Sequence, residues 1–536
     1  MGRRGLAVLL FLLILVPSAQ FAWRNRDMPD FSDLHDDGLL FVSAKSLAQG
    51  QGYRIASLPE RPYQTKYPPF YPWVLSWVWR VNPSFPANLV VCTFLCWLTL
   101  ALCIGLSFVF YGQEPELKKY KWWMIALLGL CPYMAFFGAR MFSEIAFTCL
   151  ALATLLFLRR TGTAWVVAAG LMAAAAYMTR TAGMALIASS LILMASRKQW
   201  RNASIFAALT VPVVLGWNLW SRMHLPLVMD QNLMYYVDYM GFQKLNVGWD
   251  NITVVLWKNF DQILFGMGSL VLPKVFDSLP VKIIAQTISV AMIVGIVRLL
   301  KQGRCADYAL FSLFSCAILV VWHFPPNERF VLPLFPLLLA GLFIEMEHLW
   351  RMLRGAFDRP KWGDRIVAAG FGGITASVLA VSIGLQFFMT FYIMQEISNQ
   401  KRAKLAEHTK DYSWLRANLP QDASVFSFDD PLLYLYTGHT GSAKALLPRY
   451  WYAGVHPKPS DSAYDFSTFC QSHGLGYAYF TAEDAQRDDR IEDLPTRLGH
   501  DRHLIAVRQT DSATIFRVNM PSKNAELTVQ PLRKAN

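Results

Sequence analysis

Apolar and polar stretches alternate along this chain in a way that predicts many membrane-spanning helices. Apolar runs long enough to cross a bilayer, which takes about 20 residues each, are separated by short charged connectors. Together they predict an all-α polytopic membrane domain over residues 1–392. We expect about eleven spans, at roughly 1–23, 87–111, 122–139, 142–158, 163–178, 181–196, 203–222, 281–299, 306–323, 330–349 and 366–392.

The distribution of Lys and Arg predicts the orientation of these spans. The basic clusters occupy alternate connectors, at Arg3–Arg4, Lys118–Lys121, Arg159–Arg160, Arg197–Arg201, Arg298–Arg304 and Arg351–Arg365. The positive-inside rule makes these connectors cytoplasmic. The opposite side of the membrane then holds the first loop, 24–86, the long loop, 223–280, and everything after about 393. Within the long loop, about 250–272 has the pattern of an interfacial amphipathic helix.

The segment 393–536 has a different pattern. It opens with a polar helix, Glu396–Leu419, and continues with short β-like runs that alternate with helical pieces such as Ser462–His473. Alternation of this kind over about 140 residues predicts a small soluble α/β domain with its own core. The predicted strands are Ser424–Phe428, Tyr477–Phe480, Leu504–Arg508 and Thr514–Val518.

The composition agrees with a membrane protein. Hydrophobic residues make up 54% of the chain, and the mean hydropathy is +0.29. The net charge of +13 does not indicate a nucleic-acid partner, because the basic residues follow the topology pattern. The eight cysteines form no CxxC or zinc-like pattern and are expected to be small buried hydrophobic residues.

The first loop carries the most promising chemistry. Two adjacent acids, Asp36 and Asp37, open an amphipathic run that ends at Gly50 and Gly52, and the loop closes on the rigid segment Tyr67–Pro72. A carboxylate is a usual general base for a hydroxyl and a suitable ligand for Mg²⁺ or Mn²⁺. Adjacent helical residues diverge by about 100°, so the two acids cannot act on one atom. The alternative is that the pair only starts the helix, since acids favour helix N-termini.

Several charged residues lie at predicted span ends on the same side as the acids. They are Arg140, Glu144, Arg180 and Arg329, with Lys66 as a weaker candidate. Arginine and lysine in a low-dielectric pocket suit a phosphate group. Each one also has a simpler explanation, because charged side chains mark span ends and extend to the interface.

Together these features resemble the integral-membrane glycosyltransferases of the C-type fold (GT-C) that use polyprenyl-phosphate-linked sugars. This group includes the protein O-mannosyltransferases and the lipid A aminoarabinose transferases. The resemblance covers most of 1–392 and rests on Asp36-Asp37, the helix to Gln49, Gly50–Tyr53 and Tyr67–Pro72, with later matches at Ser143-Glu144, Thr179-Arg180 and Arg329–Pro333. Two features differ from the family pattern: Asp37 replaces a Glu found in mannosyltransferase-like members, and Tyr67 separates Lys66 from the prolines.

The resemblance implies transfer of a sugar from an undecaprenyl- or dolichyl-type phosphate to an extracytoplasmic glycan, lipid or protein, with inversion. It implies that Asp36 is the general base or a ligand of Mg²⁺ or Mn²⁺, supported by Asp37. It also implies that Arg180, Arg329 and Lys66 bind the donor phosphate, and that Glu144 organises the pocket beside Arg140. The implied location is a bacterial inner membrane, with the active site and the C-terminal domain extracytoplasmic.

Two other functions fit parts of the pattern. A transporter or flippase for a lipid-linked sugar would use the same membrane domain, but few ionisable residues fall at predicted mid-span positions. A non-catalytic membrane anchor that presents residues 393–536 as a binding module would leave the Asp36–Pro72 pattern unexplained.

Overall fold

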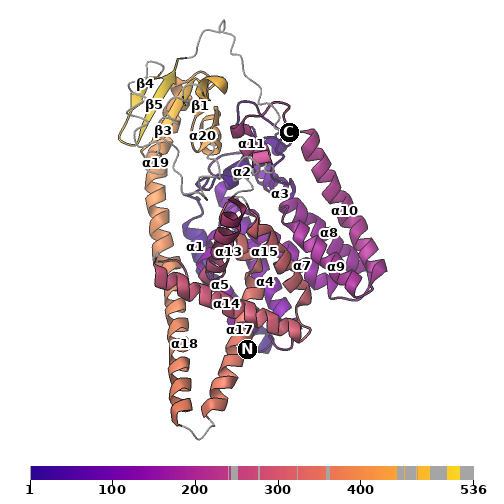
Figure 1. Ribbon diagram of the computed structural model, residues 1–536. Coiled ribbons are helices and arrows are strands. Elements are labelled where there is room, and N and C mark those ends of the chain that lie inside the picture. Colours follow the sequence, from indigo (N-terminus) through magenta and orange to yellow (C-terminus); the bar gives the residue numbers. More distant parts are fainter. Residues whose placement is uncertain are drawn as a thin grey trace. The chain divides into compact units, whose positions relative to one another are not determined.

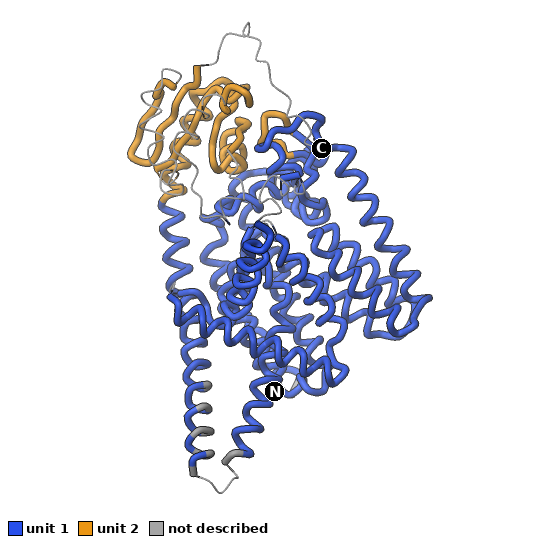
Figure 2. Tube along the Cα trace, in the orientation of Figure 1, with its two compact units in different colours: residues 1–54, 62–403, 446–453 blue, residues 55–61, 404–445, 454–536 orange. Residues whose placement is uncertain are grey.

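The computed structural model is mainly helical (Figure 1). It describes residues 2–238, 241–242, 251–275, 278–322, 324–357, 362–443, 452, 466, 469–482, 484 and 504–519. The chain forms two compact units, coloured separately in Figure 2. Unit 1 comprises residues 1–54, 62–403 and 446–453, and unit 2 comprises residues 55–61, 404–445 and 454–536.

Six helices among the described residues are long and apolar enough to cross a membrane. They are α1 (Arg3–Arg24), α4 (Leu89–Gln113), α10 (Trp200–Met223), α14 (Leu279–Lys301), the helix Glu328–Gly355 that contains most of α17 (Phe335–Phe357), and the helix Gly372–Asn418 that contains most of α18 (Trp362–Phe388). A seventh candidate is the pair α5 (Lys121–Leu130) and α6 (Pro132–Gly138), which is bent by 63°. The bend lies where Pro132 opens α6, because proline cannot continue the hydrogen bonding of the preceding helix.

Unit 1 also contains four shorter apolar helices. They are α7 (Ser143–Leu158), α8 (Thr163–Thr179), α9 (Gly183–Ser196) and α15 (Ala306–Val320). Each coincides with one of the predicted spans. Length and composition support six or seven spans, so the predicted count of about eleven remains a prediction that depends on these four helices.

The close packing of α14 against α17 depends on glycine. A Cβ atom added to Gly295 in α14 would lie 1.8 Å from the carbonyl oxygen of Gly341 in α17. Small residues allow helix backbones to approach each other closely in membranes. Any larger side chain at Gly295 would therefore push the two helices apart.

The first loop folds into two helices, α2 (Asp36–Ala48) and α3 (Phe70–Val81). The α2 helix begins at the predicted residue and ends one residue before the predicted end, Gln49. Gly50 and Gly52 follow it at φ +73° and +84°, where glycine is favoured. The indole N–H of Trp79 donates to the carbonyl of Phe41 at 3.2 Å. This bond joins α3 to α2.

Shorter elements complete the part of unit 1 on which the site is built. These are α11 (Gln231–Val237), α13 (Ile252–Ser269), α16 (Glu328–Val331) and the 3-10 turn η2 (Leu332–Leu334). The α13 helix falls within the predicted amphipathic segment, and its position at an interface stays a prediction. The side-chain amide of Asn259 in α13 donates to the carbonyls of Leu319, Val320 and Trp322 at 2.9–3.2 Å. These bonds join α13 to the end of α15 and to the residues that follow it.

The last span and the polar helix after it are one continuous helix. The α18 helix passes through a π-helical turn, η3 (Met389–Ile393), into α19 (Met394–Asn418). The sequence predicts a span at 366–392 and a polar helix at Glu396–Leu419, and both are helical. A single π turn inside an α-helix inserts one residue without ending the helix.

Unit 2 contains a five-stranded mixed sheet of order β2-β1-β3-β5-β4. Its strands are β1 (Ser424–Phe426), β2 (Thr440–Ser442), β3 (Tyr477–Thr481), β4 (Leu504–Gln509) and β5 (Ala513–Val518). The β1 strand pairs in parallel with β2 and β3, whereas β5 pairs antiparallel to β3 and β4. The helix α20 (Asp430–Thr437) connects β1 to β2.

The core of unit 2 is aromatic. Its buried residues include Phe426, Phe466, Phe480 and Phe516. The four predicted strands are all present, while β2 was not predicted because its three residues carry no strand pattern. Half of the predicted helix Ser462–His473 lies outside the described residues, and the described residues 466 and 469–472 are helical.

Candidate active site

The side chain of Asp36 is directed at charged and polar groups from other segments. Its Oδ2 atom lies 2.8 Å from the Nη2 of Arg329, and its Oδ1 accepts a hydrogen bond from the hydroxyl of Tyr67. The side chain remains 20% exposed. Asp36 is the first residue of α2, and the preceding His35 makes no side-chain capping bond. Starting the helix is therefore not the full explanation for this acid.

Arg329 joins two carboxylates. Its Nη2 pairs with Asp36, and its Nε pairs with the Oε1 of Glu144. The short helix α16 positions this arginine, because the Asn327 side chain caps the helix by accepting from the Arg329 N–H at 3.1 Å. The guanidinium carbon lies 4.5 Å from the ring centroid of Phe142. The side chain is thus held by ion pairs and by an aromatic face.

Glu144 is a fully buried acid in the first turn of α7. Besides Arg329, it pairs with the Nη1 of Arg180 at 2.6 Å, and the same Nη1 lies 3.1 Å from the Ser143 hydroxyl. The second carboxylate oxygen, Oε2, has no hydrogen-bond partner among the described residues. Glu144 therefore holds both arginines through one oxygen, Oε1.

Lys66 lies in a loop held in place by local hydrogen bonds. The side-chain oxygen of Gln64 accepts from the N–H groups of Lys66 and Tyr67 at 3.2 and 3.4 Å. The hydroxyl of Tyr53 donates to the Tyr67 carbonyl at 2.8 Å. The Lys66 Nζ lies 4.2 Å from the ring centroid of Tyr235 in α11. This loop therefore holds a buried cation next to Tyr67, which itself contacts Asp36.

The charges of the site shift the pKa values of its members. Burial alone would raise the pKa of Asp36, but the charges of Arg329 and Lys66 and the Tyr67 hydrogen bond outweigh it and lower the pKa to about 2. Burial lowers the pKa of Lys66 to about 8, against the opposing effect of the Asp36 charge. Asp36 is therefore an ionised carboxylate near neutral pH. Lys66 is mostly protonated at neutral pH and loses its proton as the pH rises through about 8.

Asp37 occupies a different environment from Asp36, as their helical spacing requires. It is 1% exposed, and its Oδ2 accepts from the Ser32 N–H at 3.1 Å. Its Oδ1 has no hydrogen-bond partner in the described part of the chain. Burial raises the pKa of Asp37 to about 7, and the nearby charges of Asp30 and Asp36 act in the same direction.

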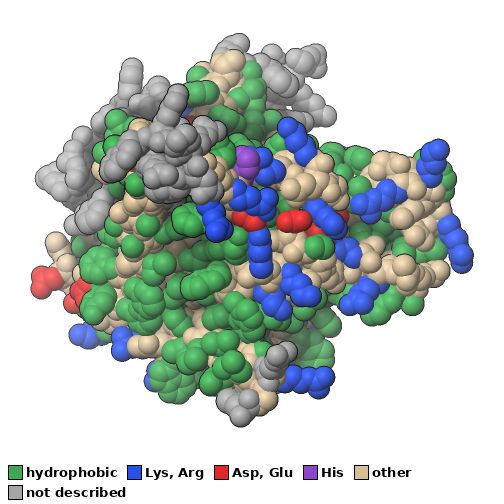
Figure 3. All heavy atoms as spheres, turned by 90° about the horizontal axis from the view of Figure 1, so that it is seen from below, with side chains coloured by type: hydrophobic (Ala, Val, Ile, Leu, Met, Phe, Trp, Pro, Cys, Tyr) green, Lys and Arg blue, Asp and Glu red, His purple; other side chains and the backbone are tan. Residues whose placement is uncertain are grey.

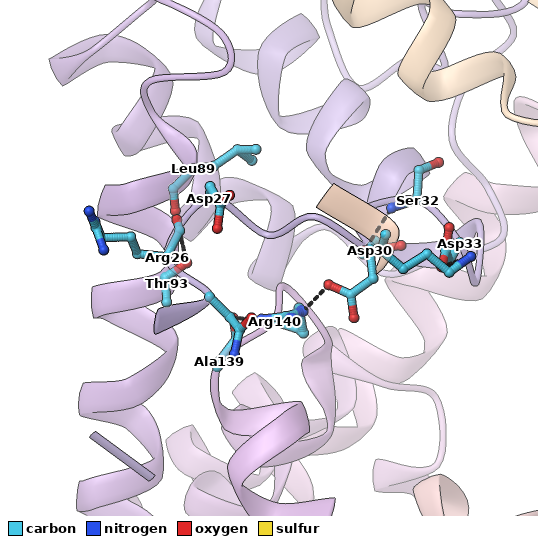
Figure 4. A network of polar contacts seen from close by, with 12 residues as sticks. Arg26, Asp27, Asp30, Ser32, Asp33, Leu89, Thr93, Ala139 and Arg140 are labelled. Carbon is cyan, nitrogen blue, oxygen red and sulfur yellow. Dashed lines mark hydrogen bonds and ion pairs between the residues drawn. The ribbon is translucent and has the colours of Figure 1, made fainter. Parts of the chain in front are cut away.

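Arg140 belongs to a separate group of charges. Its Nε lies 2.5 Å from the Oδ1 of Asp30, and Figure 4 shows this pair close to Ser32. The guanidinium also faces the rings of Phe21 and Phe136. Glu144 was expected to organise the pocket beside Arg140. Among the described contacts Arg140 pairs with Asp30, and two other arginines pair with Glu144.

The described residues offer no cluster of metal-ligating side chains, and the possible role of Asp36 as a ligand of Mg²⁺ or Mn²⁺ stays a prediction. No group of three or more His, Cys, Asp and Glu side chains in the described ranges could hold a metal ion. Both oxygens of Asp36 already contact a cation or a hydroxyl donor. The positive charge beside Asp36 comes from Arg329 and Lys66.

Several residues of the site were not predicted. Tyr67 was interpreted only as part of a rigid proline segment, although it contacts Asp36. Tyr235 was one of many aromatic residues in the long loop, and its contact with Lys66 joins segments far apart in the sequence. Asp30 was not singled out at all. A signal for it was available, since it is an acid in the same loop as Asp36 and Asp37.

A cavity of about 200 Å³ adjoins the site. Its lining is both polar and apolar: Asp30, Tyr133, Phe136, Phe137, Asn327, Glu328, Arg329, Met389, Met394, Ile397 and Ser398. Arg329 therefore borders this cavity while it pairs with Asp36.

The fold is shared with solved membrane-enzyme structures. The crystal structure of ArnT from Cupriavidus metallidurans bound to undecaprenyl phosphate matches with a TM-score of 0.52 and 14% identity, over 97% of this chain and 99% of that one. The same ArnT in the apo state matches with a TM-score of 0.52 and 13% identity, over 96% of this chain and 98% of that one. The resemblance to lipid A aminoarabinose transferases is confirmed at the level of the fold. No protein-family model and no curated protein sequence matches the chain.

Proposed function

We propose that this protein is a glycosyltransferase that moves a sugar from a polyprenyl-phosphate donor, of the undecaprenyl type, to an acceptor hydroxyl. The observation that carries the proposal is the contact between Asp36, a partly exposed carboxylate, and Arg329. Such a pair places a proton acceptor next to a phosphate-binding cation. The shared fold with an ArnT that binds undecaprenyl phosphate supports the donor class.

The charge of the site favours an anionic donor. The site holds three positive charges, on Lys66, Arg180 and Arg329. It holds two negative charges, on Asp36 and Glu144, so its net charge is +1. A phosphodiester carries one negative charge. Arginine binds phosphate oxygens in a bidentate manner, and these contacts are stronger where water is excluded. We assign donor phosphate binding to these three cations.

Donor binding would also activate the base. In the free protein the charges of Arg329 and Lys66 hold the pKa of Asp36 low, which makes Asp36 a weak base. A phosphate that shares these cations would reduce their effect on Asp36 and raise its pKa. A general base works best when its pKa approaches the ambient pH. Asp36 therefore becomes an effective base only when the donor is bound.

The chemical step then follows from these positions. Asp36 accepts the proton of the acceptor hydroxyl while that oxygen attacks the anomeric carbon of the donor sugar. The bond between this carbon and the phosphate oxygen breaks, and its electron pair stays on the leaving polyprenyl phosphate. Arg329, Arg180 and Lys66 stabilise the developing negative charge. A single displacement of this kind inverts the configuration at the anomeric carbon.

The remaining predicted site residues support this arrangement. Glu144 positions Arg329 and Arg180, since both arginines pair with its Oε1. Asp37 is the less suitable base, because its 1% exposure leaves no room for an acceptor. Arg140 fixes Asp30 at the edge of the adjoining cavity. We further propose that the site and unit 2 are extracytoplasmic in a bacterial inner membrane, which the alternation of basic connectors supports.

A transfer assay with the purified full-length protein tests the proposal. The protein is incubated with a radiolabelled polyprenyl-phosphate sugar and membrane extract, and the label is followed by chromatography. The expected result is label on an acceptor together with free polyprenyl phosphate. Donor that binds, or moves across proteoliposomes, without cleavage of the sugar–phosphate bond would overturn the proposal and favour a transporter.

A further inference from the structure

A second cavity among the described residues lies away from the proposed active site, and four arginines line it. It has a volume of about 440 Å³ and lies where several helices of unit 1 end. Its lining consists of Gln113, Glu114, Arg159, Arg160, Arg197, Gly303, Arg304, Cys305, Ala306 and Asp307. These residues come from the ends of α4, α7 and α9 and from the connection between α14 and α15. Cavities of this size accommodate a small ligand or a headgroup.

One of the four arginines fixes the wall of the cavity. Arg159 contacts Asp307 through its Nε and Nη2 at 2.7 and 2.8 Å, and its Nη1 lies 2.9 Å from Glu114. The side chain is 17% exposed, and its guanidinium carbon lies 4.7 Å from the ring centroid of Phe110. A bidentate pair that is also stacked on a ring holds a rigid geometry. Arg159 therefore ties the end of α7 to α15.

The other three arginines carry positive charge that the described residues do not neutralise. The side chains of Arg160, Arg197 and Arg304 are exposed, and none of them forms an ion pair with another described residue. The lining contains four arginines and two acids, Glu114 and Asp307, so the net charge around the cavity is +2. Figure 3 shows Lys and Arg side chains gathered around a few acidic ones on the face seen from below.

The backbone supports the convergence of these side chains. Arg304 lies between Gly303 at φ +71° and Cys305 at φ +54°. Arg304 is therefore flanked on both sides by a left-handed residue, a conformation that non-glycine residues such as Cys305 adopt infrequently. All three residues line the cavity. The positive-inside rule explains why arginines occur in these connectors, but it does not require them to meet around one cavity.

We propose that this cavity binds the phosphate group of an anionic ligand, supplied either by a lipid headgroup or by a free phosphate. Arginines that converge from different segments suit phosphate oxygens. Basic pockets between membrane helices on one side of a bilayer bind anionic headgroups. The lining residues belong to the ends of apolar helices, where headgroups are present at high concentration. The site is independent of the proposed transfer reaction.

Lipid retention by the full-length protein tests this assignment. The protein is purified in a neutral detergent, supplied with phosphatidylglycerol or phosphatidylcholine, and analysed by native mass spectrometry. In parallel, its thermal unfolding is followed with inorganic phosphate at constant ionic strength. The variant combines Arg160→Gln, Arg197→Gln and Arg304→Gln. A matched control removes the same charge from exposed residues outside the cavity, through Lys118→Gln, Lys198→Gln and Arg201→Gln.

We expect the wild type and the control to retain phosphatidylglycerol in preference to phosphatidylcholine. The cavity variant should bind phosphatidylglycerol at least about tenfold more weakly than the wild type does. A loss of this size is the usual effect of removing charge-assisted contacts. A rise in unfolding temperature with inorganic phosphate alone, lost in the cavity variant, would support the same site with a free anion as its ligand. Equal losses in the control and cavity variants, or no saturable binding of either probe, would overturn the proposal. If the triple variant fails to fold, the three single variants decide by the same criterion.

Discussion

The guanidinium of Arg329 lies 2.8 Å from the carboxylate of Asp36, although the two residues belong to α16 and to the first loop. This contact makes the two side chains interdependent. Arg329 lowers the pKa of Asp36, and Asp36 neutralises part of the charge that would attract a phosphate. Protonation of Asp36, or binding of a phosphate to Arg329, is therefore expected to change the electrostatic environment of the other side chain.

Replacement of Asp36 gives the most direct test of the chemistry. Asp36→Asn should reduce transfer by roughly 10² or more, because asparagine cannot accept the acceptor proton. Expression and donor binding should be close to normal, since asparagine has the same size and still accepts a hydrogen bond from Tyr67. The matched control is Asp33→Asn, the same change at an acid that pairs with Lys401. Full transfer activity in Asp36→Asn would refute the assignment of the base.

Replacement of the arginines should affect donor affinity more than the rate of the chemical step. Arg329→Ala and Arg180→Ala should each weaken donor binding by about tenfold to a few hundredfold, equivalent to about 1.5–3 kcal/mol for one charge-assisted contact. Donor titration by intrinsic fluorescence measures this change. The control is Arg222→Ala, at an exposed arginine near the end of α10. Unchanged donor affinity in both variants would show that these arginines only terminate their helices.

Much of the fold is predictable from the sequence because hydropathy acts locally. The first-loop helix, the polar helix after the last span and four strands of unit 2 all occur where the periodicity places them. Two features were beyond this reasoning. The 63° bend at Pro132 divides one predicted span, and the π turn at Met389–Ile393 joins two predicted helices. Pro132 is visible in the sequence, but Pro17 and Pro212 lie inside continuous helices, so a proline alone does not predict a bend.

Several residues that the sequence suggested as site candidates do lie together, but their pairings could not be predicted. Residue type and predicted topology placed Asp36, Glu144, Arg180 and Arg329 on one side, and the structure brings these four into one connected set. The same reasoning placed Arg140 with them, whereas it pairs with Asp30. A position at a span end gives the side of the membrane but not the partner. Partners are set by how separate segments pack, which a single sequence does not specify.

Donor affinity should depend on pH through Lys66. A lysine is charged below its pKa, and burial lowers the pKa of Lys66 to about 8. Donor affinity should therefore be constant below about pH 7 and should fall as the pH rises through 8. In Lys66→Arg the cation stays charged over this range, so the decline should disappear. An identical decline in the wild type and in Lys66→Arg would contradict the assignment of Lys66 to the donor phosphate.

Removal of divalent cations should leave the transfer rate unchanged. The described residues offer no group of three acidic, histidine or cysteine ligands, and Arg329 contacts the carboxylate that would bind a metal. The rate is measured after dialysis against EDTA and again after addition of Mg²⁺ or Mn²⁺. A loss of more than about tenfold that Mg²⁺ restores would show that Asp36 exchanges Arg329 for a metal ion during turnover.

The buried acid Asp37 should make folding stability depend on pH. Its pKa is raised from the ordinary value of 3.8 to about 7 in the folded protein, so the folded state binds this proton more tightly than the unfolded state does. The resulting stabilisation is complete below about pH 4 and is lost as the pH rises through 7. Asp37→Asn keeps an oxygen that accepts from the Ser32 N–H but has no charge to bury. We expect the unfolding temperature of the wild type to fall between pH 5 and pH 8 and that of Asp37→Asn to fall less, so that the variant is the more stable protein at pH 8. Parallel curves for the two proteins would show that Asp37 is not the group that titrates.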